Sequence, residues 1–211
     1  MQEEIFFFKN KNKYKKMKKL IEETYFINKL LPNKIFKKTY NNFLCQEFDL
    51  IMCDEFWENI KKLSILSDDD KVIFGVLDPS PEYFYKYFGY YSIVELSTDI
   101  ENKKISNLIE YAPKNNEADS IFSNSTIIIC FPLSKKWAIY ADRDFEISIL
   151  AFEEDYIEPL KYFLSKWVSI EEAIDTFLYS LFEVMPKFLK TLNISKEDFK
   201  KTLIKNYTNL L

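Results

Sequence analysis

Three carboxylates alternate along one short segment of the chain: Asp142, Asp144 and Glu146. Arg143, the only arginine, stands between the first two. If the segment were extended, the three carboxylates would share one face and could bind a hard cation or transfer protons. Together with Asp78 they would form the active site of a metal-dependent hydrolase, which is one hypothesis for this chain. Two carboxylates beside an arginine also suit a tight turn held by ion pairs, and we favour this second interpretation.

Two acidic triplets could act through their charge, and their members are Asp68, Asp69, Asp70, Glu153, Glu154 and Asp155. The first triplet lacks the glycine and the glutamate that follow at fixed spacing in a calcium-binding loop, which excludes an EF-hand. We therefore expect both triplets to contribute negative charge rather than a metal site.

The composition excludes several classes of catalytic site. There is no histidine, so Ser-His-Asp and Cys-His nucleophiles and His-ligated metals are absent. Gly75 and Gly89 are the only glycines, which rules out a GxGxxG or Walker-type phosphate loop. Cys45, Cys53 and Cys130 have no metal-binding spacing and are expected to be buried, reduced thiols. We expect no catalytic residue, no metal and no cofactor.

Charge is unevenly distributed along the chain, whose formal net charge is -4. Residues 1–40 hold 11 lysines against 4 acidic residues, and residues 186–211 hold 6 lysines against 2. The middle, residues 41–185, holds 12 basic against 27 acidic residues. An acidic body repels nucleic acid and attracts a basic partner, so we expect a protein partner and no nucleic acid.

No segment has the composition of a membrane span or a secretion signal. The chain begins Met-Gln-Glu-Glu, which is acidic where a signal peptide is basic. The longest apolar runs fall far short of the roughly 18 residues that a spanning helix needs. We therefore expect a cytoplasmic protein without membrane contact.

The elements that must position these residues begin with a basic amphipathic helix. A helix is predicted from Tyr14 to Leu31, because apolar residues recur every three or four positions, lysines cover the opposite face and Pro32 ends the pattern. The lysines between Lys13 and Lys29 leave open a nucleic-acid-binding or regulatory module. A second helix is predicted over residues 54–66.

The next segment alternates strand and helix signals. Lys71 to Leu77 is a β-branched run of strand length. Ser80 can cap a short aromatic helix over residues 82–88, which Gly89 can end in the left-handed conformation. Residues 90–96 read as another strand.

Residues 97–125 carry no clear pattern, except for an apolar segment near residue 105 that suits a strand or a helix. Residues 126–131 are apolar on both faces, as in a central strand. A hairpin is predicted with strands at 137–140 and 145–150 and a turn at 141–144. In its second strand the inward residues would be Phe145, Ile147 and Ile149, and the outward ones Glu146 and Ser148.

The last third of the chain predicts helices. Ser169 and Glu172 form a capping box for a helix whose apolar stripe reaches Phe182 and which Pro186 interrupts or kinks. Ser195 can cap a final helix. Together the elements predict a single α+β domain over residues 1–211. Its central, mostly antiparallel sheet would have about five strands, flanked by N-terminal and C-terminal helices.

Two segments support a family resemblance: Asp78-Pro-Ser-Pro-Glu-Tyr-Phe-Tyr-Lys-Tyr-Phe-Gly89 and Trp137-Ala-Ile-Tyr-Ala-Asp-Arg-Asp-Phe-Glu-Ile-Ser-Ile-Leu150. Together they resemble the immunity-type proteins of bacterial polymorphic-toxin and contact-dependent-inhibition systems, in which a tryptophan-led hairpin near the end of the sheet is common. The resemblance covers 26 of the 211 residues and rests on motifs that define a fold.

The resemblance implies a non-catalytic inhibitor that binds one cognate toxin and blocks its active site or substrate groove. Many such toxins are basic nucleases, which would give the acidic body a use. No functional residue transfers by motif, so the partner-binding residues are predicted from charge alone: Asp68, Asp69, Asp70, Asp142, Arg143, Asp144, Glu153, Glu154 and Asp155. The oligomeric state stays open.

Overall fold

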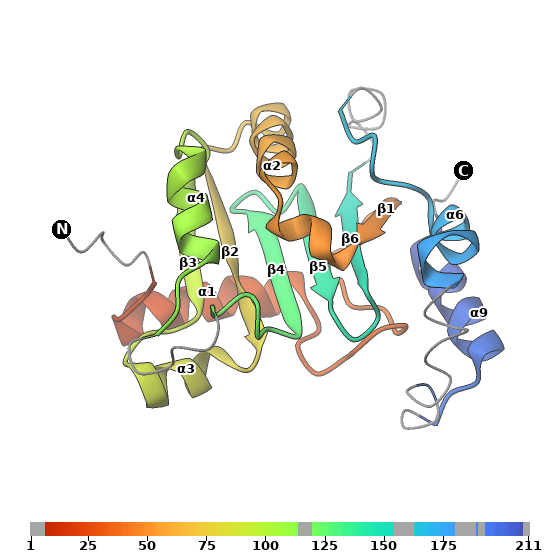
Figure 1. The fold of residues 1–211 in the computed structure, drawn as a ribbon, viewed down its shortest axis with the longest axis horizontal. Coiled ribbons are helices and arrows are strands. Elements are labelled where there is room, and N and C mark those ends of the chain that lie inside the picture. Colours follow the sequence, from red (N-terminus) through yellow and green to blue (C-terminus); the bar gives the residue numbers. More distant parts are fainter. Residues whose placement is uncertain (1–6, 114–119, 154–162, 180–188, 190–192, 209–211) are drawn as a thin grey trace.

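The computed structural model describes residues 7–113, 120–153, 163–179, 189 and 193–208. Its centre is an antiparallel sheet of six strands in the order β1-β6-β5-β4-β2-β3 (Figure 1). The strands are β1 Asn42–Glu47, β2 Lys71–Asp78, β3 Ile93–Ser97, β4 Ile127–Pro132, β5 Trp137–Asp142 and β6 Ile147–Phe152. The predicted α+β class with a central antiparallel sheet is confirmed.

Helices cover both faces of the sheet. The helices are α1 Lys11–Thr24, η1 Phe48–Met52, α2 Asp54–Ser67, α3 Pro81–Phe88, α4 Asn102–Ile109, α6 Ile170–Asp175 and α9 Lys196–Tyr207. Apolar residues of α1, α6 and α9 pack in one core cluster with the sheet, and those of η1, α2, α3 and α4 pack in a second. Figure 1 shows α2 and α4 in front of the sheet and α1 behind it. The sheet is therefore buried on both sides.

The first helix is shorter than predicted. It ends at Thr24, and Tyr25 is extended and bridges Phe36, so the predicted continuation to Leu31 is wrong. The Tyr25 hydroxyl donates to the Ile139 carbonyl at 2.8 Å and lies 3.3 Å from that of Cys130. These contacts with distant strands override the helical spacing of the sequence.

A strand is present where none was predicted. Strand β1 pairs along its whole length with β6, from Asn42 opposite Phe152 to Glu47 opposite Ile147. It is buried on both faces, so it lacks the alternation by which a strand is recognised. The sheet therefore has six strands rather than about five.

The hairpin is confirmed, but its turn is displaced. Ala141 and Asp142 still pair with β6, so the turn occupies residues 143–146 instead of 141–144. Phe145 lies in the turn but is buried, as predicted, and Glu146 is exposed. Ser148 is fully buried, so its predicted outward position is wrong. The reason is that η1 and α2 cover the face that was expected to meet solvent.

The short aromatic helix α3 is confirmed in detail. The Ser80 hydroxyl accepts a hydrogen bond from the Tyr83 amide at 3.2 Å, and Gly89 ends the helix with a φ of 78°. Residues 97–125, left open by the sequence, contain α4. The strand predicted at 90–96 begins at Ile93, because Tyr91 and Ile93 instead exchange hydrogen bonds with Phe8.

The C-terminal caps are confirmed. Ser169 accepts from the Glu172 amide at 3.1 Å, and Ser195 from that of Asp198 at 3.0 Å. Helix α6 ends at Asp175, and after a turn at Thr176 the chain is helical again at residues 177–179, so the predicted helix is present there with a break. The predicted helical stretch at residues 181–182, the interruption at 186 and residue 210 of the last helix lie outside the described residues.

The three tryptophans, Trp57, Trp137 and Trp167, are buried in the core. Cys45 and Cys130 are buried, and burial raises the pKa of both thiols. Cys53 is exposed, so its predicted burial is wrong; it lies between η1 and α2 at the surface. In the part of the chain that the structure describes, no helix is both long and apolar enough to cross a bilayer.

Candidate partner-binding surfaces

Asp142 supports the hairpin turn from inside. Its side chain is 2% exposed, and its Oδ1 accepts a hydrogen bond from the Asp144 amide at 3.1 Å. The pKa of Asp142 is raised to about 7, mainly by burial and in smaller part by the charges of Asp144 and Asp78. The oxygen of this side chain bonds to the backbone of the turn, and the buried side chain offers almost no surface to a partner.

Arg143 is held by backbone carbonyls rather than by its acidic neighbours. Its Nε donates to the Ser125 carbonyl at 2.7 Å and its Nη2 to the Phe122 carbonyl at 3.1 Å. The guanidinium also lies 4.5 Å from the centre of the Phe48 ring, a cation–π distance. Arg143 therefore joins the turn to η1 and to the segment before β4, and the ion pair expected from the sequence is not formed within the described residues.

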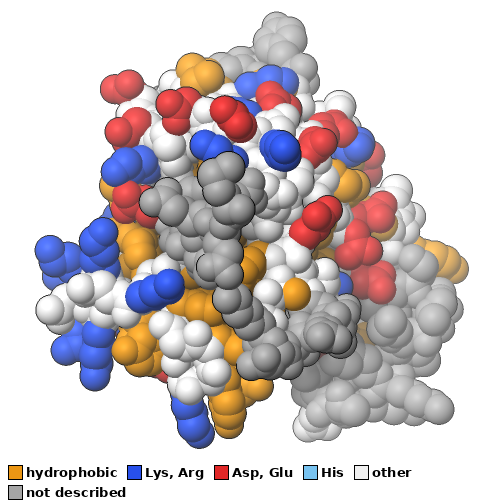
Figure 2. All heavy atoms as spheres, turned by 60° about the vertical axis from the view of Figure 1, so that its left-hand side comes forward, with side chains coloured by type: hydrophobic (Ala, Val, Ile, Leu, Met, Phe, Trp, Pro, Cys, Tyr) orange, Lys and Arg blue, Asp and Glu red, His pale blue; other side chains and the backbone are white. Residues whose placement is uncertain are grey.

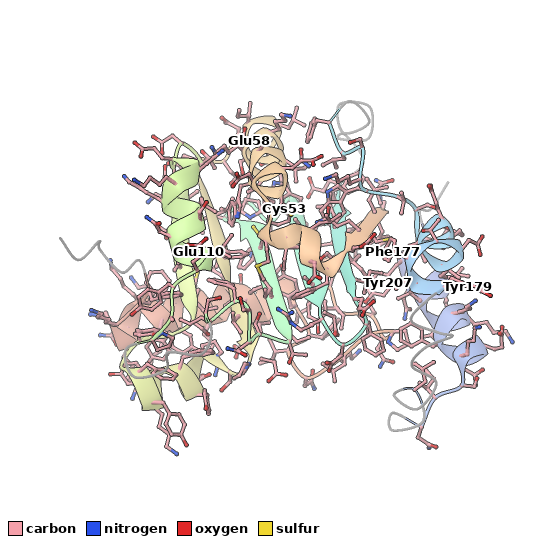
Figure 3. All side chains as sticks on the ribbon, viewed as in Figure 1. Cys53, Glu58, Glu110, Phe177, Tyr179 and Tyr207 are labelled. Carbon is pink, nitrogen blue, oxygen red and sulfur yellow. The ribbon has the colours of Figure 1, made fainter. Side chains whose placement is uncertain are left out.

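An acidic hollow lies beside this turn. We use the term for a cavity of about 480 Å³ that is lined by Glu47, Phe48, Asp49, Arg143, Glu146 and Phe177. The three carboxylates are exposed, and none forms an ion pair in the described part of the chain. Figure 3 shows Phe177 between the β1 edge of the sheet and α6. The hollow combines aromatic residues with an excess of negative charge, because three carboxylates face one guanidinium.

The first acidic triplet lies at the opposite end of the sheet from the hollow. Asp70 immediately precedes β2, whereas the hairpin turn follows the far end of β5. Asp69 accepts hydrogen bonds from the Ser134 amide at 3.2 Å and from its hydroxyl at 2.6 Å. Asp68 ends α2 in the left-handed conformation.

Glu153 lies at the same end as the first triplet and forms an ion pair with Lys38. Glu154 and Asp155 lie outside the described residues. The acidic residues singled out from the sequence are therefore divided between the two ends of the sheet. Only Arg143 and the exposed Asp144 lie at the turn beside the acidic hollow and reach the surface there.

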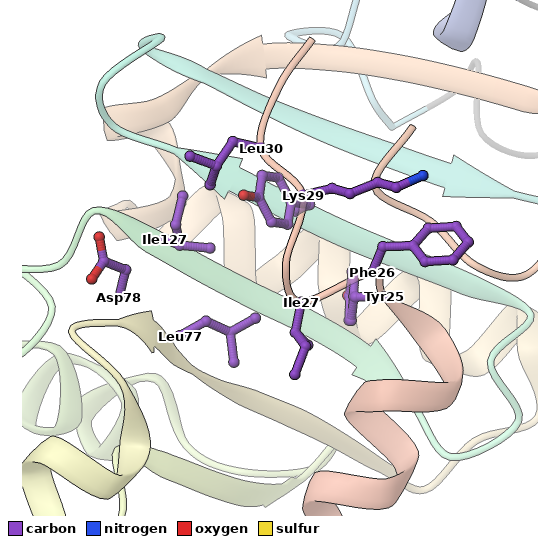
Figure 4. Close-up of a pocket in the computed structure, with 9 residues that line it drawn as sticks. Tyr25, Phe26, Ile27, Lys29, Leu30, Leu77, Asp78 and Ile127 are labelled. Atoms are coloured by element: carbon purple, nitrogen blue, oxygen red, sulfur yellow. The ribbon is translucent and has the colours of Figure 1, made fainter. Parts of the chain in front are cut away.

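The four carboxylates of the hydrolase hypothesis do not gather in one place. Asp78 and Asp142 both pair with Ile127, so strand β4 lies between them. Glu146 lines the acidic hollow, whereas Asp78 lines a second cavity, of about 220 Å³ (Figure 4). Among the described residues, no group of three acidic or cysteine side chains could hold a metal ion.

A third surface was not anticipated from the sequence. Helix α3 exposes three tyrosines, Tyr83, Tyr85 and Tyr87, next to the lysines of α1. The sequence signal was present, because five of the eight residues of α3 are aromatic, whereas its buried positions are only Pro81 and Phe84. A helix with so few buried positions leaves the rings of Tyr83, Tyr85 and Tyr87 at the surface.

Comparisons with protein-family models, with curated proteins and with solved structures find no match for this chain. Its function must therefore be inferred from the geometry of these surfaces.

Proposed function

We propose that this protein is a non-catalytic inhibitor that binds and neutralises a cognate bacterial toxin in the cytoplasm, and that a basic nuclease is the kind of toxin it binds. The observation that carries the proposal is the acidic hollow, whose carboxylates Glu47, Asp49 and Glu146 form no ion pair with any other residue that the structure describes. The resemblance of the segments at 78–89 and 137–150 to immunity-type proteins supports the same function.

The hollow suits a lysine or arginine side chain of a partner. The half-buried ring of Phe177 would pack against the apolar stem of such a side chain, and the carboxylates would accept hydrogen bonds from its charged end. Arg143 also lines the hollow and offsets part of this charge, but the three carboxylates outnumber its single guanidinium, which backbone carbonyls and the Phe48 ring hold in place. Charged groups left without an internal partner favour fast, steered association with an oppositely charged protein.

The function is tested by co-expressing the protein with the product of the gene immediately upstream. We expect a stoichiometric complex that survives moderate salt during purification, and restored growth where the neighbour alone is toxic. A harmless neighbour, or a protein that elutes alone, would contradict the proposal.

The binding surface is tested by reversing charges in the hollow. Asp49→Lys and Glu146→Lys should each weaken toxin binding by about tenfold or more, because each places a cation where the partner presents one. Glu110→Lys is the matched control: it makes the same charge change on an exposed residue just after α4, away from the hollow (Figure 3).

Asp70→Lys separates the two acidic regions, because Asp70 lies at the other end of the sheet. If Asp70→Lys abolishes binding while the hollow variants bind normally, the first acidic triplet is the contact surface and the hollow is not. Titration calorimetry of the purified pair measures all four variants on one scale.

A further inference from the structure

Three tyrosine rings form a column between α1 and α3. The rings of Tyr14 and Tyr91 stack with centroids 3.7 Å apart and planes 10° apart, and those of Tyr91 and Tyr85 with 4.4 Å and 12°. Tyr14 and Tyr91 are buried, whereas Tyr85, at the end of the column, is 40% exposed. The column therefore ends in a partly exposed ring that stacks on two buried rings.

Two more rings extend the aromatic surface across α3. Tyr83 and Tyr87 are 45% and 58% exposed, and their ring centroids lie 4.5 Å apart. Figure 2 shows hydrophobic side chains, tyrosines included, gathered on the lower part of this face with lysine side chains at their border. Exposed rings at this density are unusual for the surface of a monomer.

Lysines line the same surface. Lys11, Lys15 and Lys18 recur at intervals of four and three residues, so they share one flank of α1. That flank faces α3, because Lys18 forms an ion pair with Glu82 at 2.6 Å. Lys11 and Lys15 are exposed and form no ion pair among the described residues.

On α3 itself, the Lys86 ammonium lies 5.0 Å from the centre of the Tyr87 ring. The two neighbouring helices therefore combine the exposed lysines of α1 with Tyr85, Lys86 and Tyr87 of α3, and Lys18 pairs with the Glu82 carboxylate between them.

We propose that this α1–α3 surface binds single-stranded nucleic acid. A nucleobase would stack on the exposed face of Tyr85 and continue the column of parallel rings, and the neighbouring phosphates would contact Lys11, Lys15 and Lys86. Stacking on aromatic rings beside a positively charged track is the general way in which proteins bind single strands. The parallel column favours this ligand over an acidic protein segment, which has no planar ring to extend it.

The overall negative charge of the chain does not oppose this site. The carboxylates of the acidic hollow lie at the β1–β6 edge of the sheet, whereas the tyrosines lie at the β2–β3 edge. The local cations form the contact, so the affinity should depend steeply on salt. With three lysines on phosphates, the slope of log K against log salt should be roughly -2.

The test is the fluorescence anisotropy of a labelled oligothymidylate of about ten nucleotides, titrated with the full chain at several salt concentrations. Tyr85→Ala should weaken binding by about tenfold, Tyr85→Phe should bind as the parent does, and Lys15→Gln should reduce the salt slope by about 0.7. Melting curves verify that each variant is folded.

Two controls match these changes elsewhere on the molecule. Tyr179→Ala removes a ring that is 55% exposed and has a lysine, Lys196, 5.7 Å from its centre. Lys201→Gln removes an exposed lysine of α9. Both should bind the oligonucleotide as the parent does.

Three outcomes would overturn the proposal. The first is that the oligonucleotide does not bind at low salt, and the second is that Tyr85→Ala and Tyr179→Ala lose the same amount of affinity. The third is that polyglutamate displaces the labelled oligonucleotide as effectively as unlabelled oligonucleotide does. The last outcome would show a surface that responds to negative charge alone and would indicate an acidic protein partner instead. The toxin-binding experiments use a different surface, so failure here leaves the inhibitor function intact, and the reverse also holds.

Discussion

The carboxyl group of Asp142 links the hairpin turn to the pH dependence of stability. Its pKa rises from 3.8 to about 7, first because it is buried and then because Asp144 lies close to it. Between these two values the folded protein keeps a proton that the unfolded chain has lost. The free energy of unfolding therefore falls as the pH rises from about 4 to about 7, and Asp142 then costs a constant amount above that range.

Asp142→Asn should remove this cost. The amide oxygen can still accept from the Asp144 backbone, but no charge is buried. At about pH 8 the variant should be more stable than the parent by up to about 4 kcal/mol, and at about pH 4.5 the difference should be small. Urea unfolding at both pH values measures it, with the exposed Asp70→Asn as control. An equal difference at both pH values would show that Asp142 is ionised throughout.

Strand β2 depends on a glycine because another part of the backbone lies against it. A Cβ added at Gly75 would lie 2.8 Å from the carbonyl oxygen of Ser92 and 3.0 Å from the Cα of Ile93. These are backbone atoms of the chain that leads into β3, and the Val76 amide donates to the same Ser92 carbonyl at 2.9 Å. The close approach holds the β3 edge, where Tyr91 supports Tyr85.

Gly75→Ala should destabilise the fold by about 1–3 kcal/mol, because the backbone of β3 must shift to admit the methyl group. Adding Ile93→Val to this variant removes the Cδ1 atom that the new methyl group would meet but leaves the backbone in place, so it should not restore stability. Chemical denaturation of Gly75→Ala and of the double variant measures both free energies of unfolding. Recovery in the double variant would place the conflict in the Ile93 side chain alone.

Elements with local signals were predictable, and those set by distant partners were not. Helix α3 carries its cap, its proline and its closing glycine within ten residues, so the sequence defines both ends. Strand β1 pairs with β6, more than 100 residues later, and the end of α1 depends on the contact of Tyr25 with β5. No local pattern records either pairing.

The same limit applies to the sites, at the scale of the whole molecule. The acidic hollow draws Glu47 and Asp49 from the end of β1 and the start of η1, Glu146 from the hairpin turn and Phe177 from beyond α6. Composition predicted an acidic body with two basic ends; the structure places the lysines of α1 near the β2–β3 edge of the sheet, and the acidic hollow at the β1–β6 edge, on the same side as α6 and α9. The distribution of charge along the chain is visible in the sequence, but which charged residues share a surface depends on the order of the strands in the sheet.

The two surfaces should act independently at physiological salt. Between β6, next to the hollow, and β2, next to α3, lie three strand spacings, about 14 Å. This exceeds the Debye length of about 8 Å at 0.15 M salt, so charges at one surface are largely screened from the other. At about 0.01 M salt the Debye length is about 30 Å, and the surfaces should then affect each other.

Glu146→Lys makes this measurable without a toxin. At about 0.01 M salt it should strengthen oligonucleotide binding, because it raises the net charge of the chain by two, and at 0.15 M it should leave the affinity unchanged within about 0.5 kcal/mol. Combined with Tyr85→Ala at 0.15 M, the two changes should be additive. A large gain in affinity at 0.15 M would mean that the oligonucleotide reaches the hollow itself. In that case the hollow and the tyrosines would belong to one continuous binding surface.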